Sequence, residues 1–389
     1  MKKLLSILCA SSLTVFGVSN IISCSSKIED DNLKNVRNIH IYEKEKKIEE
    51  NIKKILIDKN GDVYFKAVFS VFVLKHGSDI AKKLEYDVIR DISIDKNNNI
   101  YFNDETNIQT INKENIKKIL SINENDHNSL WKIYNINDDI YFTRSNGIYV
   151  LKNGETEAKV INKLNGNLNK ISIDSKDNVY FGTDTGAYVL KNGETEAKVI
   201  NKLNGNLNKI SIDSKDNVYF GTDTGAYVLK NGETEAKVIN KLNGNLNKIS
   251  IDSKDNVYFG TDTGAYVLKN GETEAKVINK LNGNLNKISI DSKDNVYFGT
   301  NAGAYVLKQD TDTLIKINGV DKEYVNFIAL YKNNVYFGTD TGVYVLKQLE
   351  TTAYKISGTS TLGKVNGFAI DKQNNIIYCR TNKGAFLIY

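Results

Sequence analysis

Most of this chain consists of short apolar segments separated by polar turns. In residues 170–190 an alternating segment, KISI, precedes a polar turn, an aromatic segment, VYF, a second turn and the apolar segment AYVL. Asn192-Gly193 then offers a tight hairpin turn before another apolar segment at 197–200. Apolar runs of this length between Asn, Asp and Gly are typical of β-strands. Since no segment keeps a period of 3.6 residues for long, the pattern predicts strands rather than helices.

These segments belong to a tandem repeat of 39 residues. The unit 152–190 recurs unchanged at 191–229 and 230–268, and a fourth copy at 269–307 differs at only two positions. Degenerate copies on both sides share an aromatic pair at the end of a strand. The pairs are Tyr64-Phe65, Tyr101-Phe102, Tyr141-Phe142, Tyr180-Phe181, Tyr219-Phe220, Tyr258-Phe259, Tyr297-Phe298, Tyr336-Phe337 and, altered, Tyr378-Cys379. The markers therefore indicate nine units.

Four short antiparallel strands in about 40 residues are typical of one blade of a β-propeller. The nearly continuous apolar strands support this, because strands between neighbouring blades are buried on both faces. We predict an all-β propeller of about nine four-stranded blades, with eight blades and a parallel β-helix as alternatives. The last unit lacks a fourth strand, and an unassigned segment stands at 38–42. We expect this N-terminal strand to close the ring and to cover an exposed edge.

The N-terminus has the pattern of a secretory signal peptide. A basic start precedes the apolar run 4–18, which is too short for a stable transmembrane helix. Ile21, Ser23 and Cys24 resemble the lipobox of bacterial lipoproteins. That resemblance implies that residues 1–23 are removed and that Cys24 carries the acyl chains of a membrane anchor. A plain signal peptide cut elsewhere and an uncleaved anchor are the alternatives.

The predicted mature chain has two parts. Residues 24–37 are polar and charged, and we predict a lipidated tether there, followed by the propeller repeat domain at 38–389. Cys379 is the one cysteine left after Cys24 is lipidated and Cys9 is removed, so no intramolecular disulfide is expected. Because Cys379 lies in an apolar run, we predict a buried thiol.

Composition and charge narrow the function classes. The chain has 389 residues, 25% of them charged, and a net charge of +5. Each perfect repeat carries five lysines and five acidic residues, so repetition cannot build the sustained positive field that a phosphate backbone needs. We therefore predict no nucleic-acid partner.

The motif ISIDSKDNVYFGTDTGAYVLK resembles the propeller repeat of the sensor domains of bacterial two-component regulators. The resemblance covers residues 38–389 with varying fidelity and implies the propeller fold and a ligand-binding or interaction role. This chain uses Tyr where Trp is usual in that family, and no kinase sequence follows the repeats. For this reason the signalling role of the family is not carried over.

Asp184-Thr185-Gly186 matches the short signature of aspartic proteases, and it recurs at Asp223, Asp262 and Asp340. That chemistry needs two carboxylates that share a proton, whereas these lie in equivalent turns, one in each unit. We interpret the motif as a hairpin turn in which Asp bonds to the backbone and Gly takes a positive φ. The same four acids are our candidates for repeated binding-loop residues.

The sequence gives little evidence for a metal site or for a catalytic histidine. Segments 58–62 and 174–178 are acidic turns, but they lack the Gly and Glu positions of a calcium loop. His40, His76 and His127 neither recur with the repeat nor have metal-ligand spacing. We expect no metal, no cofactor and no catalytic residue, since identical units cannot supply unlike groups to one point.

The sequence predicts a lipid-anchored, extracytoplasmic propeller that acts as a surface binding or adhesion module and not as an enzyme. The expected partners are the membrane, through Cys24, and an extracellular protein, glycan or small molecule, and the protein itself is expected to be a monomer. One alternative is a ligand-binding sensor or transport accessory lipoprotein that uses the central funnel. Another is a hydrolase or lyase on a propeller scaffold.

Overall fold

The computed structural model describes residues 36–38, 40–43, 46–47, 51–78, 80–84, 86, 88–103, 107–112, 115–121, 132–144 and 147–389. The chain divides into two compact units, 1–33 and 34–389, and every described residue belongs to the second. The predicted signal peptide, Cys24, the predicted tether up to residue 35 and His127 lie outside the described residues.

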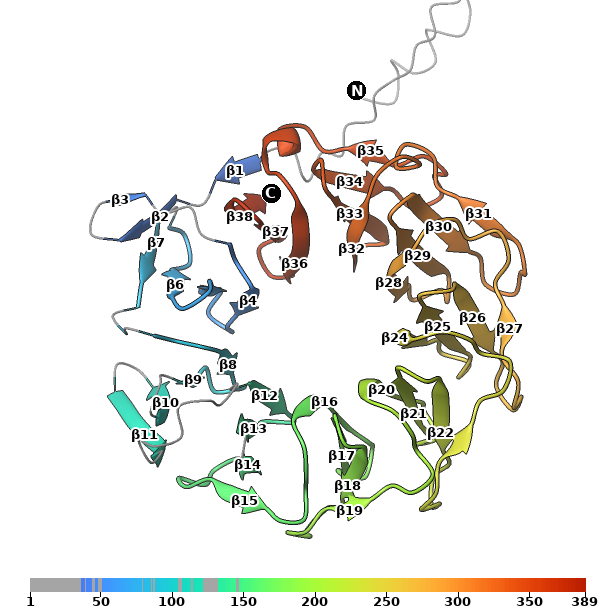
Figure 1. The fold of residues 1–389 in the computed structure, drawn as a ribbon. Helices are drawn as coiled ribbons and strands as arrows, with labels where there is room; N and C mark the ends of the chain where they lie inside the picture. Colours follow the sequence, from blue (N-terminus) through green and yellow to red (C-terminus); the bar gives the residue numbers. More distant parts are fainter. Residues whose placement is uncertain are drawn as a thin grey trace, which may run out of the picture. The chain divides into compact units, whose positions relative to one another are not determined.

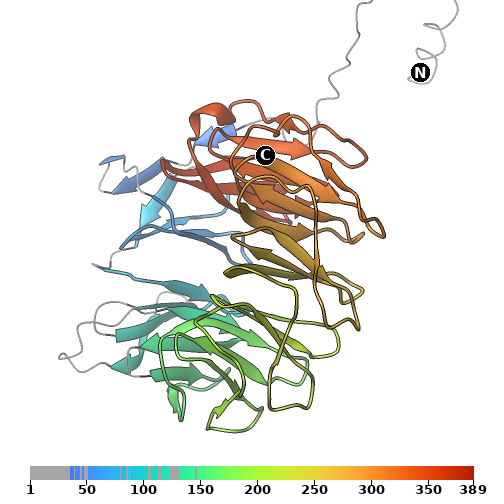
Figure 2. The same cartoon turned by 45° about the vertical axis from the view of Figure 1, so that its right-hand side comes forward.

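Nine β-sheets follow one another around a common axis, which makes this unit a nine-bladed β-propeller (Figure 1). Eight blades have four strands, and the first blade carries two further strands at its outer edge. The turned view shows the sheets as separate layers around the axis (Figure 2). Among the described residues the one helical element is the 3-10 turn η1 (Thr359–Thr361). The predicted fold class is confirmed, with nine blades rather than eight.

The strands of each blade run in chain order from the axis outward, apart from three N-terminal strands that lie at the outer edges of blades 1 and 9. Blades 1 to 3 contain β4 (Lys54–Ile57), β5 (Val63–Lys66), β6 (Val71–Leu74) and β7 (Ile80–Lys83), then β8 (Ile92–Ile94), β9 (Ile100–Asn103), β10 (Asn107–Asn112) and β11 (Asn115–Ser121), then β12 (Ile133–Ile136), β13 (Asp139–Arg144), β14 (Gly147–Leu151) and β15 (Lys159–Ile161). Blades 4 to 6 contain β16 (Leu168–Ile173), β17 (Val179–Thr183), β18 (Ala187–Leu190) and β19 (Lys198–Val199), then β20 (Leu207–Ile212), β21 (Val218–Thr222), β22 (Ala226–Leu229) and β23 (Lys237–Val238), then β24 (Leu246–Ile251), β25 (Val257–Thr261), β26 (Ala265–Leu268) and β27 (Lys276–Val277). Blades 7 to 9 contain β28 (Leu285–Ile290), β29 (Val296–Thr300), β30 (Gly303–Leu307) and β31 (Leu314–Lys316), then β32 (Val325–Tyr331), β33 (Asn334–Thr339), β34 (Val343–Leu346) and β35 (Tyr354–Lys355), then β36 (Val365–Asp371), β37 (Ile376–Thr381) and β38 (Gly384–Ile388).

The aromatic pair explains why the second strand of each blade is apolar on both faces. Tyr141 of blade 3 packs edge-on against Phe181 of blade 4, with ring centroids 6.0 Å apart. Tyr180 faces the other way, into the cluster that contains Phe220 of blade 5. Successive side chains on a strand point to opposite faces, so one pair joins a blade to both of its neighbours. The core is therefore a series of interfaces between blades.

The N-terminal segment closes the ring, as predicted, but with different residues. The strand β1 (Val36–Asn38) pairs antiparallel with β38, placing Asn38 opposite Phe386. Residues beyond 38 were expected in the same strand. Instead β2 (His40–Glu43) pairs in parallel with β7 of the first blade and also with β3 (Lys46–Lys47). The N-terminal segment thus connects the last and first blades, because β1 pairs with the edge of one sheet and β2 with the edge of the other.

Candidate functional site

The predicted binding-loop acids lie in equivalent turns between the second and third strands of four blades. They are exposed, and they are Asp184, Asp223, Asp262 and Asp340. Asp184 accepts hydrogen bonds from the backbone N–H of Asn167 at 2.8 Å and from its side-chain amide at 2.9 Å. The backbone contact recurs in the next two blades at 2.9 Å. Gly186 has a φ of +145°, so the interpretation of this motif as a hairpin turn is confirmed.

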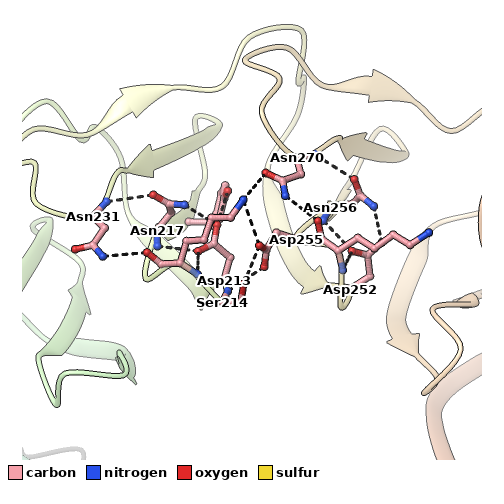
Figure 3. A network of polar contacts seen from close by, with 11 residues as sticks. Asp213, Ser214, Asn217, Asn231, Asp252, Asp255, Asn256 and Asn270 are labelled. Atoms are coloured by element: carbon pink, nitrogen blue, oxygen red, sulfur yellow. Dashed lines mark hydrogen bonds and ion pairs between the residues drawn. The ribbon is translucent and has the colours of Figure 1, made fainter.

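The turns at the opposite face include the acidic segments considered as calcium loops. Their carboxylates accept hydrogen bonds from other residues of the chain (Figure 3). In blade 5, Asp213 accepts hydrogen bonds from the backbone N–H of Asn217 at 2.8 Å and from the Tyr219 hydroxyl at 3.1 Å. The neighbouring Ser214 donates to Asp255 of blade 6 at 2.8 Å. Within the described part of the chain, no group of three or more His, Cys, Asp or Glu could hold a metal ion. These turns therefore connect the blades to one another.

A group of four lysines lies on the innermost strands of successive blades. The inner-strand lysines are Lys170, Lys209, Lys248 and Lys287, on β16, β20, β24 and β28. Each is half-buried. None forms an ion pair with a carboxylate among the described residues, and the charged groups that act on Lys209 are the other three lysines. Four like charges therefore meet near the axis without an acidic partner.

Burial lowers the pKa of three of these lysines, and repulsion between lysines contributes for two of the three. Burial, followed by the charges of Lys170 and Lys248, lowers the pKa of Lys209 to about 8. Burial also lowers the pKa of Lys248 and of Lys287. In place of an acid, these lysine side chains contact polar and aromatic groups. The Nζ of Lys248 lies 3.2 Å from the side-chain oxygen of Asn247, and the Nζ of Lys287 lies 4.9 Å from the centroid of Phe327.

Blade 1 shows how the same position looks when an acid is present. Lys54 immediately precedes the Ile that pairs with the marker Phe, as Lys170 does in blade 4. Its Nζ lies 3.1 Å from a carboxylate oxygen of Asp91 at the start of the blade 2 inner strand. In the identical blades the residue at the position of Asp91 is again a lysine. Repetition of one sequence therefore removes the acidic neighbour.

A cavity of about 430 Å³ lies at blades 7 to 9 and the start of blade 1, and Asn286, the neighbour of Lys287 on β28, is one of its lining residues. Its lining residues are Asn51, Lys53, Asn286, Tyr324, Asn326, Lys364, Asn366 and Arg380. We call this the axial cavity. None of the eight is acidic, and burial lowers the pKa of the Arg380 guanidinium. Lys364 has a carboxylate nearby, since its Nζ lies 3.6 Å from Asp340.

One of the four predicted loop acids, Asp340, is connected to the axial cavity. Asp340 accepts a hydrogen bond from the side-chain amide of Asn326 at 2.7 Å, and Asn326 lines the cavity. The corresponding acids in blades 4 to 6 also bond within their own blade, but to the backbone N–H of an Asn that does not line the cavity. Of the four acids, Asp340 is therefore the one whose hydrogen-bond partner belongs to the cavity.

Sequence reasoning missed the inner-strand lysines. Their signal was present, because a lysine opens the segment KISI in all four copies of the repeat. Balanced charge within each repeat concealed it. Cys379, by contrast, is buried as predicted, and burial raises the pKa of its thiol. In the described residues, no helix is long and apolar enough to cross a membrane.

Comparison with known proteins establishes the fold alone. No protein-family model matches the sequence, and no curated protein is significantly similar to it. The Dos1 propeller has a TM-score of 0.57 at 12% identity, covering 87% of this chain and 92% of that structure. The computationally designed protein Ika8 has a TM-score of 0.55 at 13% identity, covering 77% of this chain and 96% of its own.

A sensor propeller is also among the matches. The extracellular domain of the putative one-component system BT4673 from B. thetaiotaomicron has a TM-score of 0.46 at 14% identity. The match covers 87% of this chain but only 57% of that domain, so the chain spans little more than half of its length.

Proposed function

We propose that this protein is a lipid-anchored, extracytoplasmic propeller that binds a ligand at its axis and catalyses no reaction. The observation that carries the proposal is the axial cavity, which extends to Asn286 beside Lys287. A concave site of about 430 Å³ is within the size range of small-ligand pockets, and its polar groups could fix the orientation of a ligand. The ligand-binding role through the central funnel is thus better supported than adhesion through the loops.

The chemistry of the cavity supports binding rather than catalysis. Its eight lining residues supply amides, ammonium groups, one guanidinium and one phenol. These groups donate hydrogen bonds and positive charge, and none of them is a carboxylate, a thiol or an imidazole. A general base or nucleophile held next to a second unlike group is the usual sign of a reaction centre.

Multivalent contact through the top-loop acids is the second candidate function. The four carboxylates are exposed in equivalent turns, and repeated weak contacts can add up to firm attachment. In three of these turns, however, one carboxylate oxygen already accepts a backbone N–H of the same blade. Less of each group is then available to a partner.

The experiment is a binding measurement on the full chain with a filled axial cavity. Asn366→Trp places an indole in the cavity, and Asn192→Trp makes the same change in an exposed hairpin turn as the control. A panel of neutral oligosaccharides, amino acids and organic acids is screened by thermal shift and equilibrium dialysis. We expect saturable binding that Asn366→Trp weakens by at least about tenfold and Asn192→Trp leaves unchanged. Binding that is indifferent to Asn366→Trp would support the loop surface instead.

A further inference from the structure

We infer that the axial site takes a ligand that carries several negative charges, such as a phosphate, sulfate or carboxylate polyanion. This inference rests on the proposed function and names the class of ligand. Its basis is two features of the inner strands: four half-buried lysines on neighbouring blades, and a cavity that begins at Asn286, next to Lys287, and whose lining contains three further cations and no acid.

The first step concerns charge balance. Half-buried ammonium groups are normally paired with a carboxylate, as Lys54 is paired with Asp91 in blade 1. The inner-strand lysines have no such partner among the described residues, and each blade brings another lysine to its neighbour. Like charges in a partly desolvated place repel one another, and a bound anion relieves this repulsion. The free protein thus contains a positive site that an anion completes.

The second step concerns the number of charges on the ligand. Lys209 experiences the charges of Lys170, Lys248 and Lys287 together, although these stand on three other strands. A single monovalent anion can neutralise one of these lysines, but the remaining lysines still repel one another. A molecule with several acidic groups can meet several lysines at once, which gives it the advantage of linked contacts.

The third step concerns the donors around the cavity. Arg380 presents a planar guanidinium, which matches phosphate and carboxylate oxygens in a two-bond geometry. In the described structure it has no ion pair with an acid. The amides of Asn286 and Asn366 add neutral donors at the same cavity. Such a set of fixed N–H groups binds oxyanions selectively over neutral molecules of equal size.

The inference is tested with one variant and its matched control. The inner variant changes Lys170, Lys209, Lys248 and Lys287 to Met, which removes charge and keeps the length of the side chain. The outer variant changes Lys159, Lys198, Lys237 and Lys276 to Met. These four are exposed on the outer strands of blades 3 to 6, and each forms an ion pair with a Glu four residues earlier. Both variants lose the same charge from equivalent copies of the repeat.

The probes are tripolyphosphate, citrate and a sulfated disaccharide, titrated calorimetrically into the full chain at low salt. We expect at least one probe to bind the wild type and the outer variant equally. The inner variant should bind it at least about tenfold more weakly, and added salt should weaken the wild-type interaction. Comparison of the three probes identifies the acid group that is preferred.

Two results would overturn the inference. One is equal affinity of the inner and outer variants for a probe, since the lysines would then be irrelevant. The other is no binding of any probe to the wild type. If a neutral ligand still binds and Asn366→Trp abolishes its binding, the proposed function stands and the anionic ligand class is wrong. Thermal unfolding of the double variant Lys209→Met/Lys248→Met separates misfolding from lost binding, because this smaller change keeps two of the four lysines.

Discussion

Lys209 is surrounded by the ammonium groups of three other inner-strand lysines, which makes its proton easy to lose. Burial is the largest cause of its lowered pKa of about 8, and the charges of Lys170, Lys248 and Lys287 contribute. An unfolded lysine titrates near 10.5, so between these values the unfolded chain binds more protons than the folded one. Folding stability of the free protein should therefore increase as the pH rises through this window.

Binding of an anion at the axis should show the opposite pH dependence. Below pH 8 Lys209 is protonated and attracts the ligand, whereas above it the charge is lost. The sulfated disaccharide is the suitable probe, because its sulfate groups stay ionised throughout this pH range. We expect its affinity to be constant toward lower pH and to fall above pH 8, by at most about tenfold per pH unit for one linked proton. The measurement is the dissociation constant from pH 6 to pH 10 for the wild type and for Lys209→Met. An identical pH profile in the variant would assign the effect to another group.

At the scale of the strand, the glycine that follows the marker Phe in blades 4 to 8 sets how closely two blades approach. Gly221 ends the aromatic segment of β21, and the side chain of Leu246 from the next blade lies directly over it. Leu246 is fully buried, so it has little room to move. In blade 9 the residue at the position of Gly221 is Arg380, and its side chain covers Gly367 on the inner strand. Gly221 thus allows tight packing between blades 5 and 6, whereas Gly367 makes room for a cation of the axial cavity.

A methyl group at these two glycines should have unequal effects. Gly221→Ala forces Leu246 aside in a packed interface and should lower the free energy of unfolding by about 1–3 kcal/mol. Gly367→Ala meets the side chain of Arg380, which can move, and should be milder. Urea denaturation of both variants measures the difference. Equal losses would mean that the clash at Gly221 is relieved by movement of the backbone.

For the whole molecule, ring closure decides which distant residues become neighbours. The pairing of β1 with β38 brings the two ends of the described unit into one blade (Figure 1). It also arranges the nearly identical blades as one arc, so that residues 39 positions apart in sequence face the same axis. Stacking of equivalent repeats is what allows one binding site to be built from four copies of one residue.

The predicted anchor is tested on the whole chain in cells. Metabolic labelling with a radioactive fatty acid should mark the wild type, and Cys24→Ala should abolish the label, since the lipobox resemblance assigns lipid to that thiol. Cys379→Ala is the control, because this cysteine is buried in blade 9 and cannot be acylated without unfolding. Label that persists in Cys24→Ala would disprove the anchor.

Local sequence patterns were enough to predict the strands, the blade as repeating unit and the structural use of Asp-Thr-Gly, and they favoured nine blades over eight. Each of these follows from local chemistry: short apolar runs, turn residues, and self-similarity over 39 residues. The segment that closes the ring was found as well, although its strand begins at Val36 and ends at Asn38.

Only the tertiary structure decided where the charges meet. Every repeat is neutral along the chain, yet folding places one lysine of each copy on an inner strand while other charged groups, such as Lys198 and Glu194, lie on the outer rim. Arg380 and Asn286 line one cavity for the same reason, although 94 positions separate them in the printed sequence. Charge balance is a property of the sequence, but the separation of charge in space depends on which strand of the blade each residue occupies.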